Sequence, residues 1–186
     1  MSRPSTTTDG RIILDAAGLA RKVEGLSKAI AKEFSSRQDE VALIGIQTRG
    51  VTLAHRVAEQ LKREWKREIP VGTLDITLYR DDVHAIADQP EVKETVIPFD
   101  IEHRTLILVD DVLFTGRTVR SAMNALIDYG RPSCIRLAVL IDRGHRELPV
   151  GPDYVGISLA TKPNDVVDVN FSEIDKEDSV RMHRKK

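Results

Sequence analysis

The stretch that decides the fold of this chain reads Thr105-Leu106-Ile107-Leu108-Val109-Asp110-Asp111-Val112-Leu113-Phe114-Thr115-Gly116-Arg117-Thr118. Its first half is an apolar run with β-branched members, which is typical of a buried strand. We expect the two adjacent carboxylates to end that strand. A helix is predicted next, because apolar residues recur at helical spacing in Val119, Ala122, Met123, Leu126 and Ile127. A strand, an acidic pair, a glycine-containing turn and a helix together indicate a ligand site at the carboxyl end of a parallel strand.

The chemistry of this unit favours a phosphorylated sugar. Amides of a glycine-containing turn that opens a helix favour an anion, so Thr115 to Thr118 should cradle a phosphate and add hydroxyl donors. Asp110 and Asp111 can accept hydrogen bonds from sugar hydroxyls, or act on a divalent cation through its water. A ligand with a phosphate at one end and a diol nearby is a ribose 5-phosphate. A P-loop and a dinucleotide fingerprint are both excluded, because neither Gly-Lys-Ser/Thr nor Gly-x-Gly-x-x-Gly occurs here.

The same residues resemble a known family. The segment from Val109 to Thr118 resembles the phosphoribosyl pyrophosphate (PRPP) motif of type I phosphoribosyltransferases. A wider likeness, from about Ile13 to about Asp175, is similar to the PyrR family, which regulates pyrimidine operons and has uracil phosphoribosyltransferase activity. This likeness includes Gly45-Ile46-Gln47-Thr48-Arg49-Gly50, Asp75-Ile76-Thr77-Leu78-Tyr79-Arg80-Asp81-Asp82 and Asp142-Arg143-Gly144-His145-Arg146-Glu147-Leu148-Pro149.

Composition sets the outer bounds. A chain of 186 residues suits one domain with a real core. The net charge of -1 gives no global attraction to nucleic acid or to anionic membranes. The single cysteine, Cys134, excludes an internal disulfide and a multi-cysteine metal site. There is no apolar signal core near the N-terminus and no apolar run of membrane-spanning length, so we expect a cytoplasmic protein without a membrane partner.

Strands are predicted to alternate with helices along the chain. Asp15 is the expected N-cap of a first helix, and a second helix is expected from Val51. The expected strands cover 41–46, 71–79, 135–141, 154–159 and 166–171. This order predicts an α/β protein with a mostly parallel, doubly wound sheet and helices on both faces. The resemblance makes it a type I phosphoribosyltransferase fold with a small hood on the base side.

The domain organisation is expected to be simple. Residues 1–10 form a Ser/Thr-rich leader that we expect to be disordered, and residues 11–176 form a single phosphoribosyltransferase domain. Residues 177–186 are a charged tail with a basic end, which we expect to be frayed and solvated. The roles of the leader and of the tail are left open.

Two further segments lie where the same ligand would extend. Thr48, Arg49 and Gly50 follow a short buried strand and could be an ordinary turn. The resemblance implies that they bind the pyrophosphate of PRPP, since Arg49 has a forked donor and Gly50 permits close backbone approach. The polar segment from Arg80 to Pro98 has no clear periodicity, so it is either a tolerated insertion or a lid that excludes water.

The resemblance also implies roles for individual side chains. Catalytic roles fall to Asp110, Asp111 and Arg80, and the uracil side to Asp142, Arg143 and Val167. Mg²⁺ is expected to enter with PRPP, on the ligand's own oxygens and without a direct protein ligand. The expected partners are PRPP, uracil and the nucleotides UMP and UTP. The expected PRPP- and nucleotide-binding residues are Thr48, Arg49, Gly50, Val109, Asp110, Asp111, Val112, Leu113, Phe114, Thr115, Gly116, Arg117 and Thr118.

Three alternatives for the function remain open. The first is a uracil phosphoribosyltransferase that also binds pyrimidine-operon mRNA under uridine-nucleotide control, with His145 and Arg146 as RNA contacts. The second is the same enzyme without RNA binding. It is favoured by Gln47, which stands where attenuating members usually have Lys, and by Glu24, Gly25 and Glu33, where neutral or basic contacts are expected. The third changes the base to a purine, because the PRPP motif cannot select uracil. In each case a homodimer or higher homo-oligomer is expected.

Overall fold

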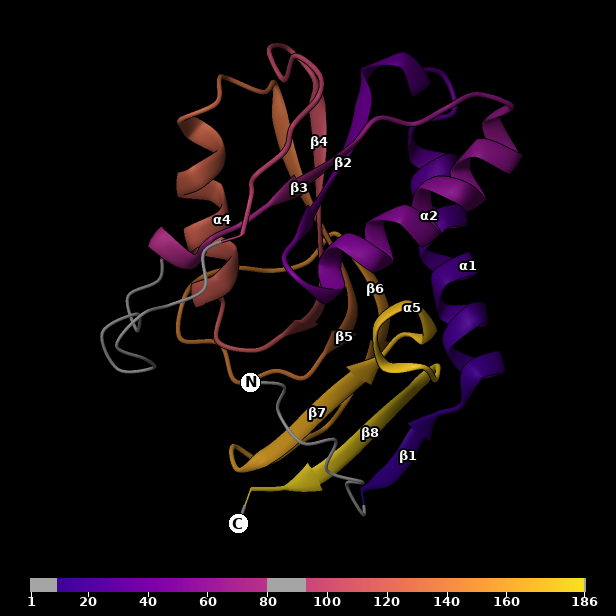
Figure 1. The fold of residues 1–186 in the computed structure, drawn as a ribbon, viewed down its shortest axis with the longest axis vertical. Helices are drawn as coiled ribbons and strands as arrows, with labels where there is room; N and C mark the ends of the chain where they lie inside the picture. The colour runs from indigo at the N-terminus through magenta and orange to yellow at the C-terminus, as the bar shows by residue number, and fades with distance from the viewer. Residues whose placement is uncertain (1–9, 80–92, 186) are drawn as a thin grey trace.

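The computed structural model describes residues 10–79 and 93–185. The leader up to residue 9, the catalytic candidate Arg80 and most of the expected lid lie outside the described residues. The centre is a five-stranded parallel sheet with the order β3-β2-β4-β5-β6 (Figure 1). Its strands are β2 (Val41–Ile46), β3 (Val71–Leu74), β4 (Thr105–Leu113), β5 (Cys134–Asp142) and β6 (Tyr154–Ser158).

Helices cover both faces of this sheet, which confirms the predicted α/β architecture (Figure 1). On one face lie α1 (Ala16–Glu33) and α2 (Arg49–Trp65), and on the other lies α4 (Arg117–Ile127). All six residues of β2 are buried, as a strand covered on both faces requires. Asp15 caps α1 as predicted, since its Oδ1 accepts a hydrogen bond from the Gly18 amide at 2.7 Å.

A second, antiparallel sheet has the order β1-β8-β7 and is built from β1 (Arg11–Leu14), β7 (Asp165–Asn170) and β8 (Ser179–Arg184). It confirms the small hood. The prediction of a frayed tail is wrong for β8, which hydrogen-bonds to strands on both sides. Val180 is fully buried, so a strand that looks charged in the sequence is held by one alternating apolar face. A short helix, α5 (Ser172–Asp175), connects β7 with β8.

The strand predicted over Val71 to Tyr79 is shorter than expected. It ends at Leu74, and a 3₁₀ turn, η2 (Thr77–Tyr79), follows. Asp75 causes the change, because its Oδ1 accepts from the Thr77 amide at 2.9 Å and from the Thr77 hydroxyl at 2.6 Å. An aspartate that bonds its own backbone two residues on closes a turn and competes with the strand. Leu78 would share a face with Leu74 and Ile76 in a continuous strand, but it is exposed while those two residues are buried.

Strand β4 is longer than predicted. The acidic pair does not end it, because Asp110 pairs with Val139 and Leu113 pairs with Asp142 of the neighbouring strand β5. Buried backbone groups need hydrogen-bond partners, and the equal length of β5 supplies them. Asp110 and Asp111 are therefore fixed by the sheet itself rather than by a loop.

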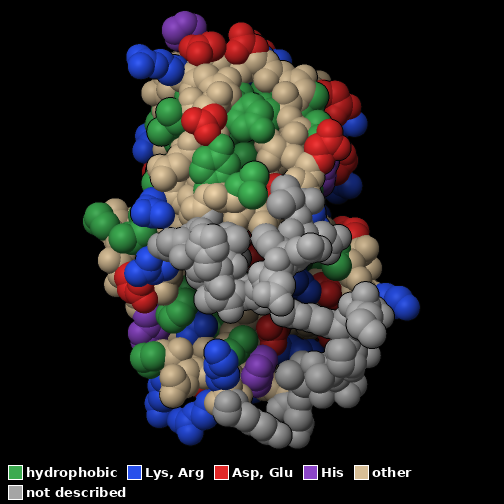
Figure 2. All heavy atoms as spheres, turned by 60° about the vertical axis from the view of Figure 1, so that its left-hand side comes forward, with side chains coloured by type: hydrophobic (Ala, Val, Ile, Leu, Met, Phe, Trp, Pro, Cys, Tyr) green, Lys and Arg blue, Asp and Glu red, His purple; other side chains and the backbone are tan. Residues whose placement is uncertain are grey.

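Figure 2 shows hydrophobic side chains gathered on one side of the surface. On the side of α4 and η2, the large exposed hydrophobic residues are Leu78, Ile127 and Tyr129. The Tyr79 hydroxyl donates to Asp128 there at 2.5 Å, so η2 is fastened to the end of α4. Within the described ranges no helix combines the length and the apolar character that crossing a bilayer would need.

Candidate active site

The acidic pair lies inside β4, in the middle of the parallel sheet. Asp110 is buried at 7 % exposure, and its Oδ1 accepts a hydrogen bond from the Asp111 amide at 3.0 Å. Burial, and then the neighbouring Asp111 charge, raise the pKa of Asp110 well above its ordinary value. Burial also raises the pKa of Asp111, although its contact with Asp110 and the charge of Arg49 act in the opposite direction. Hydroxyl or cationic groups of a bound ligand would lower both pKa values again, because they stabilise the ionised carboxylates.

The predicted phosphate turn follows this pair and opens α4. Gly116 has φ of +92°, a left-handed conformation that favours glycine, and it caps the helix. The Thr115 carbonyl accepts from the amides of Glu147 at 3.0 Å and Leu148 at 3.2 Å. Arg117 Nε donates to the Glu147 carboxylate at 2.7 Å. The turn is therefore held from outside by the segment after β5. Within it the Arg117 amide donates to the Thr115 hydroxyl at 3.4 Å, and a turn of this kind at the start of a helix favours an anion.

The predicted pyrophosphate turn lies next to the acidic pair. Arg49 and Gly50 form the first turn of α2, at the carboxyl end of β2. A Cβ atom on Gly50 would lie 2.5 Å from the Val109 carbonyl oxygen and 3.2 Å from the Asp110 Cα. The contact with β4 therefore requires glycine at this position, independently of the close approach of backbone to phosphate that was expected from the sequence. Arg49 Nη2 pairs with Asp175 Oδ1 at 2.7 Å.

Lys93 is a further candidate site residue, which the sequence did not reveal. Its Nζ donates to the Thr48 hydroxyl at 2.8 Å, and its amide donates to Asp75 at 2.6 Å. Lys93 lies 45 residues from Thr48 in the chain, in a segment without periodicity. The only feature of the sequence that could have pointed to Lys93 is its place in the expected lid segment. The contact brings a cation to the pyrophosphate turn.

The predicted base-side turn touches the phosphate turn. The Arg143 amide donates to the Leu113 carbonyl at 3.1 Å, and the Arg143 guanidinium lies 4.1 Å from the centre of the Phe114 ring. Arg143 is buried, and burial lowers its pKa while Asp165 acts in the opposite direction. Its Nη2 donates to the Lys162 carbonyl at 3.2 Å, but its buried Nε has no hydrogen-bond partner among the described residues.

Arg146 and His145, the two expected RNA contacts, bond within the protein. Arg146 donates to the carbonyls of Val150 at 3.0 Å and Phe114 at 2.8 Å, and to the Asp142 carboxylate at 2.7 Å. These bonds tie the phosphate turn to the base-side turn. His145 is exposed and its Nε2 lies 2.8 Å from the Thr161 carbonyl oxygen.

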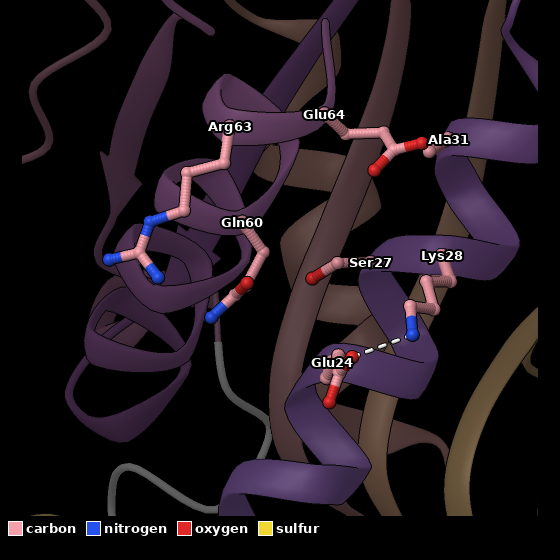
Figure 3. A pocket seen from close by; sticks show the side chains of 7 residues that line it. All are labelled: Glu24, Ser27, Lys28, Ala31, Gln60, Arg63 and Glu64. Carbon is pink, nitrogen blue, oxygen red and sulfur yellow. Dashed lines mark ion pairs between the residues drawn. The ribbon is translucent and has the colours of Figure 1, made fainter.

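One of the first-helix positions expected to meet RNA, Glu24, lines a polar pocket between α1 and α2 (Figure 3). Another, Glu33, accepts a hydrogen bond from the Tyr154 hydroxyl at 2.6 Å. Glu24 is paired with Lys28 at 2.6 Å, and the lining also carries Arg63 and Glu64. Two acids and two bases make the lining neutral, which gives no electrostatic attraction to a phosphate backbone. The pocket is lined by Glu24, Ser27, Lys28, Ala31, Gln60, Arg63 and Glu64.

The structure therefore brings most predicted site residues to one edge of the sheet. The acidic pair contacts the pyrophosphate turn through Gly50, and the phosphate turn contacts the base-side turn through Arg143 and Arg146. Val167 is not in one of these turns but in β7 of the hood, where its side chain is buried in the same core cluster as Val109 and Ile141. The arrangement can hold one elongated ligand that carries phosphate at both ends of a sugar.

Comparison with known proteins defines the class. Residues 10–173 match the phosphoribosyl transferase domain family. The fold is similar to a hypoxanthine phosphoribosyl transferase of Trypanosoma cruzi, with a TM-score of 0.72 at 16% identity over 94% of this chain and 91% of that one. A hypoxanthine phosphoribosyltransferase of Staphylococcus aureus gives 0.68 at 15% identity, over 97% and 96%. These identities show the fold alone. The fold and the matched domain together define a phosphoribosyltransferase.

Closer relatives define the family. The chain is 49% identical over 173 residues to a "Bifunctional protein PyrR" of Thermus aquaticus, covering 93% of this chain and 95% of that protein. It is 50% identical over 182 residues to a protein of the same name from Deinococcus deserti, covering 98% and 96%. The chain belongs to the PyrR family of type I phosphoribosyltransferases.

Proposed function

We propose that this protein transfers phosphoribose from PRPP to uracil, giving UMP and pyrophosphate. The observation that carries the proposal is the contact of three turns around the acidic pair of β4. The pyrophosphate turn touches β4 at Val109, and the phosphate and base-side turns are joined by Arg146. Uracil as the base is what the resemblance to the PyrR family implies, and the chain's membership of that family supports it.

In this reaction the bond between C1 of the ribose and the pyrophosphate oxygen breaks, and its electron pair leaves with pyrophosphate. A ring nitrogen of uracil forms the new bond to C1, and the proton of that nitrogen is released. Positive charge builds on the sugar and negative charge on the leaving group, so carboxylates near the ribose and cations near the pyrophosphate stabilise the transition state. We assign no residue as an obligatory general base, because positioning and electrostatics can supply much of the rate.

Each part of the ligand then has a place. Asp110 and Asp111 accept from the ribose hydroxyls. Thr115 to Thr118 bind the 5-phosphate. Arg49 and Lys93 approach the pyrophosphate, and Arg80 is proposed to join them. Together these groups place one ligand along the edge of the sheet, with its sugar over β4.

Mg²⁺ fits this site as a partner of the ligand. Within the described ranges no cluster of three or more His, Cys, Asp or Glu side chains could hold a metal by itself. The acidic pair does offer carboxylate oxygens, and burial raises the pKa of both carboxyls although the charge of Arg49 opposes it at Asp111. Bound to PRPP, the ion would neutralise charge on the leaving pyrophosphate, with Asp111 the more accessible of the two carboxylates toward it.

The uracil side is proposed at Asp142, Arg143 and Val167. Arg143 is the best-supported of the three, because its buried Nε has no partner among the described residues. A buried donor without a partner costs free energy that a carbonyl oxygen of the base would recover. Asp142 is occupied, since its Oδ1 accepts from the Gly144 amide at 2.9 Å and from Arg146 at 2.7 Å. Asp142 therefore contributes to base binding by holding the base-side turn in its conformation.

The ribose assignment is tested with Asp111→Asn. The asparagine side chain is neutral and cannot stabilise the positive charge that builds on the sugar, so turnover should fall by at least roughly tenfold. Asp100→Asn, on the exposed loop before β4, is the matched control. Unchanged turnover in the Asp111 variant would contradict the assignment.

We also propose, from the resemblance to the PyrR family, that uridine nucleotides in this site control binding to pyrimidine-operon mRNA. The neutral pocket beside α1 and the internal bonds of Arg146 support the second candidate, the same transferase without RNA binding. Filter binding to the leader of the protein's own pyrimidine operon, with and without UMP, separates the two. Absence of UMP-sensitive binding at moderate salt would leave the transferase alone.

We propose a homodimer or larger homo-oligomer in the cytoplasm, as is the commonest arrangement for soluble enzymes. Analytical ultracentrifugation with and without PRPP measures the assembly. A monomer at micromolar concentration in both conditions would contradict it.

A further inference from the structure

Two arginines on α2 reach the same short helix. Arg49 and Arg56 are seven residues apart, which places them two turns apart on one face of α2. Both bond to α5 or to the residues just after it. In Figure 1, α5 lies beside the first half of α2. A segment of the hood therefore docks on the helix that begins with the pyrophosphate turn.

Arg56 is the anchor of this docking. Its guanidinium bonds to Glu173 at 2.5 Å, to Asp178 at 2.7 Å and to Ser172 at 3.1 Å, and it lies 4.8 Å from the centre of the buried Phe171 ring. These contacts use all three nitrogens of the Arg56 guanidinium, Nε, Nη1 and Nη2. They lie two turns along α2 from the turn that meets β4, so Arg56 holds the segment without reaching the site.

Arg49 is held differently. Its Nη2 donates to Asp175 Oδ1 at 2.7 Å, and Asp175 Oδ2 accepts from the Phe171 amide at 3.0 Å. The carboxylate is thus fixed through both oxygens. The Nε of Arg49 is buried and has no hydrogen-bond partner among the described residues. Nη2 of the guanidinium is thus bonded to Asp175, whereas Nε, in the pyrophosphate turn, has no partner among the described residues.

Arg49, which carries this unpaired donor, lies near the acidic pair. Gly50, the next residue, contacts Val109 and Asp110, and the charge of Arg49 favours the ionised form of Asp111 against the larger effect of burial. A buried donor left without a partner is costly, and an oxygen of a bound ligand removes that cost. A guanidinium fixed before the ligand arrives also loses less rotamer freedom on binding.

From this arrangement we infer that Asp175 is a positioning residue, which holds the Arg49 guanidinium in place to bind the pyrophosphate of PRPP. The inference rests on the proposed function and adds the hood's contribution to it. The segment that carries Asp175 is far from the PRPP motif in sequence, so the hood and the pyrophosphate turn form one unit. Disturbing Asp175 should affect the pyrophosphate end of the ligand more than the base.

The test measures binding of magnesium pyrophosphate to the full chain by calorimetry, together with kcat and KM for PRPP. Asp175→Asn should weaken pyrophosphate binding roughly tenfold and raise KM for PRPP, because one charge-assisted hydrogen bond is lost. Asp175→Glu should restore part of the affinity. Asp178→Asn is the matched control, since it loosens the same segment through Arg56 and the Ser172 amide and leaves the bond between Asp175 and Arg49 in place.

Three outcomes would contradict the inference. Equal or tighter pyrophosphate binding in Asp175→Asn would show that Asp175 does not position the donor. An equal loss in Asp178→Asn would assign the effect to docking of the segment in general. Wild-type protein that does not bind magnesium pyrophosphate would contradict the proposed function itself, and the inference with it, which separates this failure from the other two.

Discussion

The carbonyl oxygen of Val109 lies 2.5 Å from the position that a Cβ atom on Gly50 would occupy. The first turn of α2 is therefore pressed against the strand that carries the acidic pair. Real Cβ atoms do not approach an oxygen so closely, and backbone on both sides cannot yield like a flexible side chain. The pyrophosphate turn can lie this close to the ribose carboxylates because Gly50 has no Cβ atom.

Gly50→Ala should therefore destabilise the protein and impair PRPP use. We expect a loss of about 1–3 kcal/mol in the free energy of unfolding, the range for overpacking a dense core. KM for PRPP should rise as the turn moves away from β4. Urea unfolding and steady-state kinetics measure the two effects.

Gly25→Ala is the matched control for that substitution. Gly25 lies inside α1, and a Cβ there would meet nothing within 4 Å. The alanine should stabilise the protein by roughly 0.5–1 kcal/mol, because glycine costs entropy inside a helix. A Gly50 variant that behaves like the Gly25 variant would contradict the close contact.

Asp110→Asn should stabilise the ligand-free protein in a pH-dependent way. The folded state raises the pKa of Asp110 above its ordinary 3.8, chiefly through burial. Folding therefore favours the protonated carboxyl of Asp110. The stability that this preference contributes is fully present below the unfolded pKa and is lost as pH rises through the folded pKa. The variant should match wild type near about pH 4 and exceed it by at least about 1 kcal/mol near about pH 8, with greatly reduced turnover. Thermal unfolding across pH checks this, and a difference that does not change with pH would argue against a costly buried charge.

The sequence predicted the parallel sheet and the acidic pair because both depend on local patterns. The apolar runs of β2, β4 and β5 and the motif from Val109 to Thr118 are each continuous in the chain. Strand β8 was missed because charged residues alternate with only Val180 and Met182, and its stability comes from pairing with β1 and β7. The early end of β3 depends on the side chain of one residue, Asp75.

Contacts between distant segments could not be predicted from spacing. Lys93 reaches Thr48, and Asp175 reaches Arg49 across 126 residues. Neither residue is part of a motif, and each is one of many charged residues in a polar stretch. Only the folded chain distinguishes them from solvated side chains.

Lys93→Gln should raise KM for PRPP by roughly fivefold with little change in kcat, since an exposed single charge contributes about 1 kcal/mol. Lys93 is exposed and bonds to Thr48 at the pyrophosphate turn. Lys62→Gln removes another exposed lysine, which is paired with Glu68, and serves as control. If both variants keep the wild-type KM, Lys93 does not meet the ligand.

Arg146→Ala should lower stability by about 1–3 kcal/mol, because partly buried acceptors on the phosphate and base-side turns lose their donor. KM for PRPP should rise with it. His145→Ala, which removes one exposed side chain, should leave both nearly unchanged. RNA contact as the main role of Arg146 would show the opposite pattern, with RNA affinity lost in both variants and the melting temperature unaltered.

The central claim is the transfer of phosphoribose to uracil, and a competition experiment tests it most directly. The protein is incubated with magnesium, limiting PRPP and equal amounts of uracil and hypoxanthine, and the nucleotides formed are separated and counted. We predict UMP as the dominant product, with one pyrophosphate released per UMP. Formation of mainly inosine monophosphate, or no consumption of PRPP, would contradict it.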